Sequence, residues 1–366
     1  MKKRTLLLAL TMVSIFVLTA CGGAANSNKA NNEAGNNKNA AANAGEEKAD
    51  GKKLKIGFVT DEGGINDQSF NQGVCEGLKK AHADFGYEVS YQESKEASDY
   101  EKNIETLLDA DNDIIVAAGF NLEEAVTEAA KNNPDVQFLI VDAANKDGIE
   151  NLTGLEFKAE EPSFLVGYIA GLTTETNKVG FVGGQESTLI KAFEVGYHAG
   201  VDQAAKEKGQ KIEFISQYVG NFSDAAKGKS IATNMYQQGA DVVFHASGGA
   251  GDGVIEAAKD MDKWAIGVDR DQSSIAPDNV LTSAMKRADS AVYKVLENLS
   301  KGEAFPGGQN LSFGLKEGDT VDIAPSSDKN VKPEILKKIE PLKQRMIKGE
   351  IKVPTTEEEY KAFEAK

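Results

Sequence analysis

Short apolar runs alternate with amphipathic segments along most of the chain. Each run is nearly continuous in apolar residues over about five positions, which is typical of parallel strands buried on both faces. Between the runs, apolar residues recur at helical spacing, as at Phe70, Val74 and Leu78. This alternation predicts an α/β fold with parallel sheets. The predicted strands are Lys55–Val59, Glu88–Tyr91, Asp113–Ala118, Val136–Asp142, Val179–Gly183, Lys211–Tyr218, Asp241–Ala246 and Trp264–Asp269.

The strand and helix pattern occurs twice. Lys55-Ile-Gly-Phe-Val59 matches Lys178-Val-Gly-Phe-Val182, and each is followed by Phe-x-x-Gly-x-x-x-Gly, which begins at Phe70 and at Phe193. The offset between the two copies is 123 residues throughout. We therefore predict two doubly wound lobes, each with its own parallel sheet, and expect the glycines to allow close helix–sheet packing. Because ligands bind beyond the carboxyl ends of strands in such sheets, the strand-end turns of both lobes should meet in one cleft.

The turn after the first strand is rich in hydrogen-bonding side chains. Ser69-x-x-Gln72 fits a helix capping box, which would use two of them. Asn66, Asp67 and Asn71 then remain, and they offer the mixed donors and acceptors that the edge of a heteroaromatic ring requires. The sequence therefore predicts that this turn contacts a ligand.

Phe70 and Phe193 occupy matched positions of the repeat. We expect each in the first turn of its helix, where two rings from opposite lobes could clamp a flat ligand. Aromatic stacking of this kind stabilises by about 0.5–1.5 kcal/mol beyond burial. The alternative is that both are core residues, as a single phenylalanine at helical spacing usually is.

The sequence offers little for catalysis. Ser247–Gly253 lacks the third glycine of a dinucleotide-binding loop, and its amides could instead hold hydroxyl or carboxylate oxygens at a helix start. The three histidines lack metal-ligand spacing, and no G-x-S-x-G elbow occurs. Asp67, Asp142 and Asp269 could meet in space for acid–base chemistry, but no nucleophile accompanies them. We expect a binding protein that uses no metal and no cofactor, not an enzyme.

The first 52 residues differ in composition from the rest. Met1-Lys-Lys-Arg4, the apolar run to Ala20 and the ending Leu18-Thr-Ala-Cys21 are together typical of a bacterial lipoprotein signal. We predict a signal peptide over residues 1–20 and lipidation of Cys21, which would anchor the chain to the membrane. Residues 21–52 lack large apolar side chains and are predicted to be a flexible tether. The alternative is an ordinary signal with a chance cysteine.

Net charge excludes some partners. The 366 residues include 41 Lys and Arg against 57 Asp and Glu, a formal net charge of −16. Loss of the predicted signal, with its three basic residues, would take this to −19. Such a balance argues against nucleic acid or anionic lipid as a partner. Cys75 is the only other cysteine, so we expect no disulfide framework.

Six stretches of the sequence together carry a family resemblance. They are Gly63–Asn71, Lys178–Gly184, Tyr218–Asp224, Met235–Phe244, Gly267–Gln272 and Leu281–Arg287. Together they resemble the basic membrane protein or purine nucleoside receptor family, the PnrA-like substrate-binding lipoproteins of ATP-binding-cassette (ABC) importers. The resemblance extends from Lys55 to about Leu299.

The resemblance implies a type I periplasmic-binding-protein fold, with two lobes joined by three crossings and a hinge. It implies a monomer, lipid-anchored on the extracytoplasmic face of the cell membrane, that delivers a nucleoside, with purine the favoured base, to a permease and ATPase. The base would lie between Phe70 and Phe193, with Asn66 or Asp67 and Asn71 at its edge. Asp269, Gly249, Asp252 and Lys286 would hold the ribose. We add Asp142 because it is the repeat counterpart of Asp269.

Lobe boundaries follow from the same pattern. We expect the first lobe to comprise residues 53–157 and about 287–318, and the second 158–286 and about 319–366. The first two crossings should fall near Leu155–Ala159 and Val280–Arg287, with a third beyond. Two alternatives for function remain: a protein of this fold that binds a sugar or signalling molecule, and a sensor or adhesin ectodomain. A sugar ligand would leave the Asn66–Asp67 turn unexplained.

Overall fold

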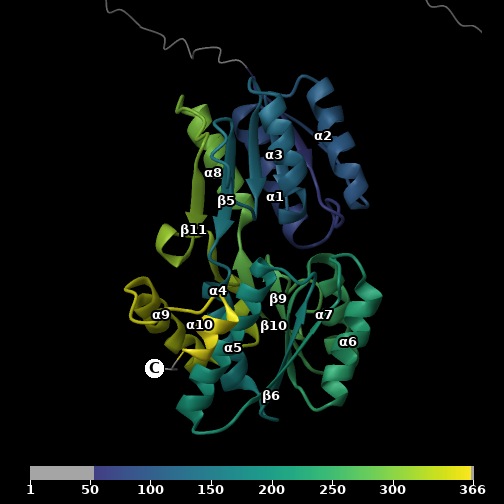
Figure 1. Ribbon diagram of the computed structural model, residues 1–366. Coiled ribbons are helices and arrows are strands. Elements are labelled where there is room, and N and C mark those ends of the chain that lie inside the picture. The colour runs from purple at the N-terminus through teal and green to yellow at the C-terminus, as the bar shows by residue number, and fades with distance from the viewer. Residues whose placement is uncertain (1–52, 364–366) are drawn as a thin grey trace, which may run out of the picture. The chain divides into compact units, whose positions relative to one another are not determined.

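The computed structural model describes residues 53–363, which form two lobes, each built around its own six-stranded sheet (Figure 1). The signal peptide, Cys21 and tether predicted within residues 1–52 lie outside the described residues. In spatial order, the first sheet contains β2 (Glu88–Gln92), β1 (Lys55–Val59), β3 (Ile114–Ala118), β4 (Gln137–Val141), β5 (Leu152–Phe157) and β11 (Asn310–Phe313). The second contains β7 (Glu213–Tyr218), β6 (Lys178–Gly183), β8 (Val242–Ala246), β9 (Trp264–Asp269), β10 (Val280–Lys286) and β12 (Val321–Ile323).

The two sheets have the same strand order. All neighbouring strands run parallel except β12, which runs antiparallel to β10. The order is the doubly wound one, whose switch points lie between β1 and β3 and between β6 and β8. The predicted fold class is therefore confirmed. All eight predicted strands are present, with ends within two residues of the prediction.

Four strands were not predicted. β5 contains Thr153, Gly154 and Glu156, and β10 contains Thr282 and Ser283, so neither is a continuous apolar run. β11 and β12 have only four and three residues, too few for a recognisable period. The chain passes from one sheet to the other after β5, after β10, and between β11 and β12.

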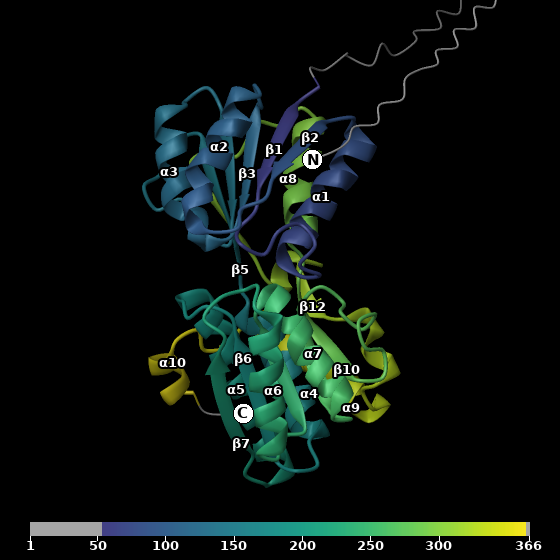
Figure 2. The ribbon, with the colours of Figure 1, turned by 90° about the vertical axis from the view of Figure 1, so that its right-hand side faces the viewer.

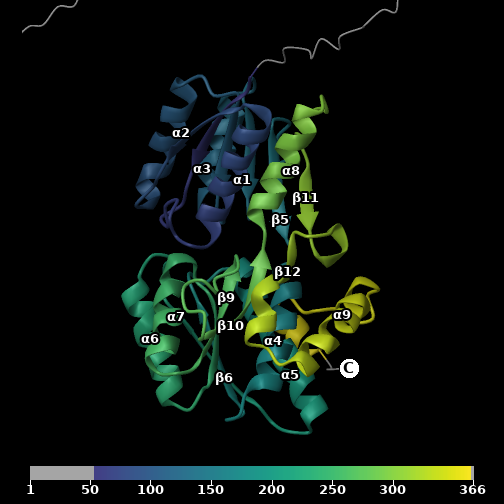
Figure 3. The same ribbon diagram turned by 180° about the vertical axis from the view of Figure 1, so that it is seen from behind.

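Helices cover both faces of each sheet. α1 (Phe70–Phe85) and α8 (Ala288–Ser300) lie on one face of the first sheet, and α2 (Tyr100–Asp109) and α3 (Glu123–Asn132) on the other (Figure 2). α4 (Glu160–Thr173) and α5 (Thr188–Lys208) pair on one face of the second sheet, and α6 (Ala225–Gln237) and α7 (Gly251–Asp260) on the other. α9 (Pro333–Ile347) lies beside α4 (Figure 3). α10 (Glu357–Lys361) contacts α5. Residues 53–363 contain no helix that is both long and apolar enough to span a membrane.

The glycines of the repeat pack helix against helix, so the expected helix–sheet packing was wrong. A Cβ atom at Gly77 would lie 2.5 Å from the carbonyl oxygen of Asp289 in α8. One at Gly200 would lie 2.1 Å from the carbonyl oxygen of Phe164 in α4. At Gly73, by contrast, no atom of the described residues lies within 4 Å of such a Cβ. The repeat therefore brings α8 onto α1 and α4 onto α5.

The two repeated helices begin at different points. α1 begins at Phe70, whereas α5 begins at Thr188 and is capped by the Ser187 side chain, which accepts from the Ile190 amide. Phe193 therefore lies in the second turn of α5, and its expected place in the first turn was wrong.

Candidate functional site

A small cavity lies between the lobes, at the carboxyl ends of strands from both sheets. The turn after β1, the 3₁₀ helix Phe120–Leu122 after β3 and Asp142 after β4 line it from the first lobe. The start of α5, the loop after β7 and the ends of β8, β9 and β10 line it from the second. Its volume is about 40 Å³. The switch points of both sheets thus meet here, as the fold predicts.

Seven of the ten predicted binding residues line this cavity: Asp67, Phe70, Asn71, Asp142, Phe193, Asp269 and Lys286. The other three do not line it. Asn66 is exposed to solvent, and Gly249 lies beside the backbone of Phe222. Asp252 is at the boundary between the lobes, where its Oδ2 accepts from Gln68 Nε2 at 3.4 Å.

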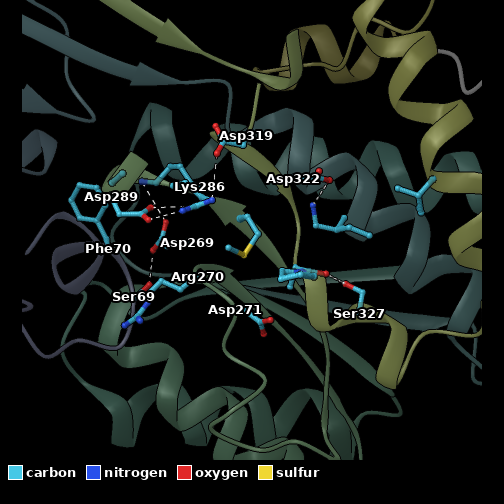
Figure 4. A pocket seen from close by; sticks show the side chains of 18 of the residues that line it. Ser69, Phe70, Asp269, Arg270, Asp271, Lys286, Asp289, Asp319, Asp322 and Ser327 are labelled. Atoms are coloured by element: carbon cyan, nitrogen blue, oxygen red, sulfur yellow. Dashed lines mark hydrogen bonds and ion pairs between the residues drawn. The ribbon is translucent and has the colours of Figure 1, made fainter. Parts of the chain in front are cut away.

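Lys286 is the centre of a buried charge cluster (Figure 4). Its ammonium pairs with Asp142 of the first lobe and lies 3.5 Å from Asp269 Oδ1 of the second. Burial alone would lower the pKa of Lys286, but the two carboxylates outweigh it and raise that pKa, so the amine is charged. Burial raises the pKa of Asp142 although Lys286 opposes it.

Asp142 and Asp269 are equivalent in the repeat and share an unusual backbone. Their φ angles are 67° and 64°, in the left-handed region that non-glycine residues rarely adopt. Both oxygens of Asp269 are engaged, because Oδ1 faces Lys286 and Oδ2 accepts from Ser69 Oγ at 2.5 Å (Figure 4). Asp142 Oδ1 is buried and has no hydrogen-bond partner among the described residues. Asp142 therefore keeps one acceptor for a ligand.

Asp67 caps α1. Its carboxylate accepts from the backbone amides of Ser69, Asn71 and Gln72 at 3.0, 2.8 and 3.0 Å. The predicted capping box is therefore wrong: within residues 53–363 the Ser69 side chain makes no cap bond, and Gln72 Oε1 accepts from the Gln68 amide. Because its oxygens are occupied, Asp67 cannot read a base as expected without losing these bonds.

Asn71 presents a free acceptor. Its Nδ2 donates to Asp61 Oδ1 at 2.7 Å and to Asp67 Oδ2 at 3.0 Å. Its Oδ1 is buried without a hydrogen-bond partner in the described part of the chain. Asp61 also lines the cavity, and burial raises its pKa to about 6. We did not predict Asp61, although its place two residues after β1 is a strand-end position.

The expected aromatic pair, Phe70 and Phe193, lines the cavity, and two further rings line it as well. Phe193 is 2% exposed and packs in the core, with its ring 6.5 Å from that of Phe244. The half-buried rings are Phe120 and Phe222, which line the cavity from opposite lobes and contact edge to face at 6.1 Å. Phe70 also faces the cavity, with the Lys286 ammonium 4.2 Å from its ring centre. Phe120 and Phe222 each follow a strand end, which is where the sequence predicts the cleft to lie.

His245 lies behind the cavity and does not line it. Its ring is fully buried, and Nε2 is 2.9 Å from Gln272 Oε1, which also accepts from the Val268 amide. Nε2 therefore carries the proton, and burial lowers the pKa of His245 to about 4. Gln272 Nε2 donates to the Gln68 carbonyl at 3.1 Å and so links the two lobes.

A wider groove of about 720 Å³ adjoins the cavity on the other side of Phe70 and Lys286 (Figure 4). The groove is open to solvent, and its charged side chains pair with one another, as Arg287 does with Asp289 at 2.8 Å. The smaller cavity is lined by two residues with an unpaired buried acceptor, Asn71 and Asp142, so we take it as the recognition site. No group of His, Cys, Asp and Glu within residues 53–363 has the arrangement of a metal site.

Residues 53–357 match the model of the family described as Bmp, ABC transporter substrate-binding protein PnrA-like. The CD4+ T-cell-stimulating antigen of Listeria innocua is 39% identical over 97% of this chain and 99% of that protein. The ABC transporter nucleoside-binding protein BmpA of Lactococcus lactis subsp. cremoris is 37% identical over 97% of this chain and its whole length, 100%. A solved solute-binding protein of an ABC transporter system from Aeropyrum pernix K1 has a TM-score of 0.77 and 27% identity, covering 84% of this chain and 96% of its own.

Proposed function

The chain belongs to the PnrA-like family of ABC transporter substrate-binding proteins, and from this premise we propose that it binds a nucleoside between its lobes. The cavity has aromatic side chains for a flat base and a charged cluster for a polar sugar. The relative from Lactococcus lactis is named a nucleoside-binding protein, which supports this ligand class. No step of the proposal requires catalysis or a cofactor.

The observation that carries the proposal is the pair of unpaired acceptors, Asn71 Oδ1 and Asp142 Oδ1. An unpaired buried acceptor costs about 1–3 kcal/mol, so each is strongly favoured to receive a donor from a ligand. A nucleoside offers donors of both kinds, an N–H on the base and hydroxyls on the ribose. We assign Asn71 to the base and Asp142 to the ribose, with Phe70, Phe120, Phe193 and Phe222 around the base.

Binding requires the lobes to separate. A cavity of about 40 Å³ has room for a few water molecules, whereas ligand pockets usually have roughly 300–1,000 Å³. Phe120 and Phe222 meet across this space, so they must part to admit a base. We propose that the hinge between the lobes provides this opening and that the lobes close again around the ligand.

The proposal includes a lipid anchor at Cys21 and delivery to a permease and ATPase by a monomer on the extracytoplasmic face of the membrane. The signal-like start and the polar stretch before Lys55 support an anchor and tether. Cys21→Ala should release the protein from the membrane fraction. If the variant still sediments with membranes after a high-salt wash, the anchor lies elsewhere.

A thermal-shift screen of the purified protein with nucleosides, free bases and hexoses tests the ligand class. We expect nucleosides to raise the unfolding temperature most, because only they supply donors to both acceptors and a ring to the aromatic walls. A shift with a hexose and none with any nucleoside would overturn the proposal.

A further inference from the structure

The orientation of the Asn71 amide is fixed by two carboxylates. Nδ2 donates to Asp61 Oδ1 and to Asp67 Oδ2, which leaves Oδ1 as the atom that needs a partner. An ionised carboxylate only accepts hydrogen bonds. Rotation of the amide by half a turn would therefore place Oδ1 against two acceptors and break both bonds.

The two carboxylates are themselves held by the backbone. Asp67 is fixed by three amides at the start of α1, and Asp61 Oδ1 accepts from the Gly63 amide at 2.9 Å. Asp61 Oδ1 therefore receives two donors, Gly63 N and Asn71 Nδ2. This arrangement is rigid, because both carboxylates accept hydrogen bonds from backbone amides of the segment that carries Asn71.

We propose that Asp61 is a positioning residue that holds Asn71 as an acceptor, so that the cavity selects bases carrying an N–H donor at that point. The inference rests on the proposed nucleoside-binding function and adds which bases the protein prefers. A base with an amino group or a lactam N–H satisfies Asn71 Oδ1. A base with only ring nitrogens and C–H at the same edge leaves that acceptor unpaired and binds more weakly.

Asp61 is the informative residue to change. Asp67 cannot be changed cleanly, because it also caps α1. Asp61→Asn keeps an Oδ1 that can accept from Gly63 and Asn71, while it removes the charge and replaces Oδ2 with an NH2 group. Asp61→Ala removes the acceptor, so Asn71 is held by Asp67 alone and its amide becomes free to turn.

The test compares adenosine and inosine, which carry an N–H donor, with purine riboside, which has none on its base. Calorimetric titration of wild type should give roughly 10- to 100-fold weaker binding of purine riboside, the factor expected when a buried acceptor loses its donor. Asp61→Asn should retain this ratio. Asp61→Ala and Asn71→Leu should reduce it to a few-fold, and the Asp61→Ala/Asn71→Leu double variant should reduce it no further.

Several results would overturn the inference. If Asp61→Ala keeps the full ratio, Asp61 does not position Asn71. If Asp61→Asn loses the ratio as Asp61→Ala does, the charge itself reads the ligand. Equal binding of all three nucleosides by wild type would also refute it, while leaving nucleoside binding intact. Absence of binding by every nucleoside would instead refute the proposed function.

Discussion

Lys286 is a single ammonium that holds two buried carboxylates, one from each lobe. Asp142 and Asp269 share the same strained backbone and meet at this amine because the repeat places them at equivalent strand ends. A buried ion pair contributes little net stability compared with an apolar replacement, but the loss of one partner leaves uncompensated charge. The cluster is therefore most sensitive to changes at Lys286.

Lys286→Met should destabilise the protein by about 3–5 kcal/mol at pH 7, because both carboxylates would stay buried without a counter-ion. Urea denaturation measures this. Lys229→Met is the matched control, since Lys229 pairs with Glu256 and Asp260 on the surface, each at 2.7 Å. The control should leave the unfolding midpoint nearly unchanged. Equal changes of the unfolding midpoint in the two variants would show that the buried cluster matters no more for stability than the surface ion pairs of Lys229.

His245 should make the fold sensitive to acid. Its pKa falls from 6.5 to about 4 on folding, so between these values the unfolded chain binds a proton that the folded chain does not. Stability contributed by the neutral ring is thus present above pH 6.5 and is lost as the pH falls toward 4, by up to about 3 kcal/mol. Denaturation curves of wild type and His245→Asn from pH 7 to 4.5 measure it. A stability difference between the two that does not vary with pH would contradict the assignment.

At the scale of elements, the sequence pattern predicted the central strands because they are buried on both faces. Ile115 faces α2 and α3 while Val116 faces α1, so every position must be apolar. Four strands escaped prediction: β5 and β10 because polar residues interrupt them, and β11 and β12 because they are very short. The positions of β11 and β12 depend on pairing with β5 and β10, which lie far away in sequence.

The turn between β1 and α1 could also be predicted only in part. Sequence singled out Asn66–Asn71, but only the folded turn shows that Asp67 caps the helix and that Asp61 and Asn71 are bonded. Likewise, the repeat matched Phe193 to Phe70, and both line the cavity, but α5 begins earlier than α1 and Phe193 is the more deeply buried ring. Phe222 takes the exposed position in the second lobe, and no internal match points to it.

The glycines of the repeat provide a test within one pair of equivalent residues. A Cβ at Gly196 would lie 2.6 Å from the Glu160 carbonyl oxygen, whereas Gly73 has open space around it among the described residues. Gly196→Ala should destabilise by about 1–3 kcal/mol through overpacking. Gly73→Ala should stabilise by up to about 1 kcal/mol, because alanine favours helix. Urea denaturation of both variants decides this, and a gain in stability for Gly196→Ala would contradict the described helix packing.

At the scale of the whole molecule, hydrogen bonds across the cleft join the two lobes in the closed arrangement. They include Ser69 to Asp269, Gln272 to Gln68, and Asn121 Nδ2 to Gln185 Oε1 at 3.0 Å. These bonds and the Lys286–Asp142 pair join two lobes that have separate sheets, and lobes of this kind can open and close about a hinge. The small volume of the cavity requires this motion if a nucleoside is to enter.

Small-angle X-ray scattering should therefore show a smaller radius of gyration when adenosine or inosine saturates the protein. The reason is that a ligand bound by both lobes favours the closed arrangement. A hexose serves as the control and should cause no change. An unchanged radius of gyration at a nucleoside concentration that calorimetry shows to be saturating would contradict closure around the ligand.

The central claim is that a nucleoside binds between the lobes with its ribose on Asp142, and calorimetric titration of adenosine and 2′,3′-dideoxyadenosine tests it most directly. A charge-assisted hydrogen bond stabilises by roughly 1.5–3 kcal/mol, so wild type should bind adenosine at least about tenfold more tightly than the dideoxy compound. Asp142→Ala should nearly abolish this preference, whereas Asp252→Ala, whose carboxylate lies outside the cavity, should retain it. A loss of affinity for both ligands alike in Asp142→Ala, or a wild type that binds neither, would contradict the account.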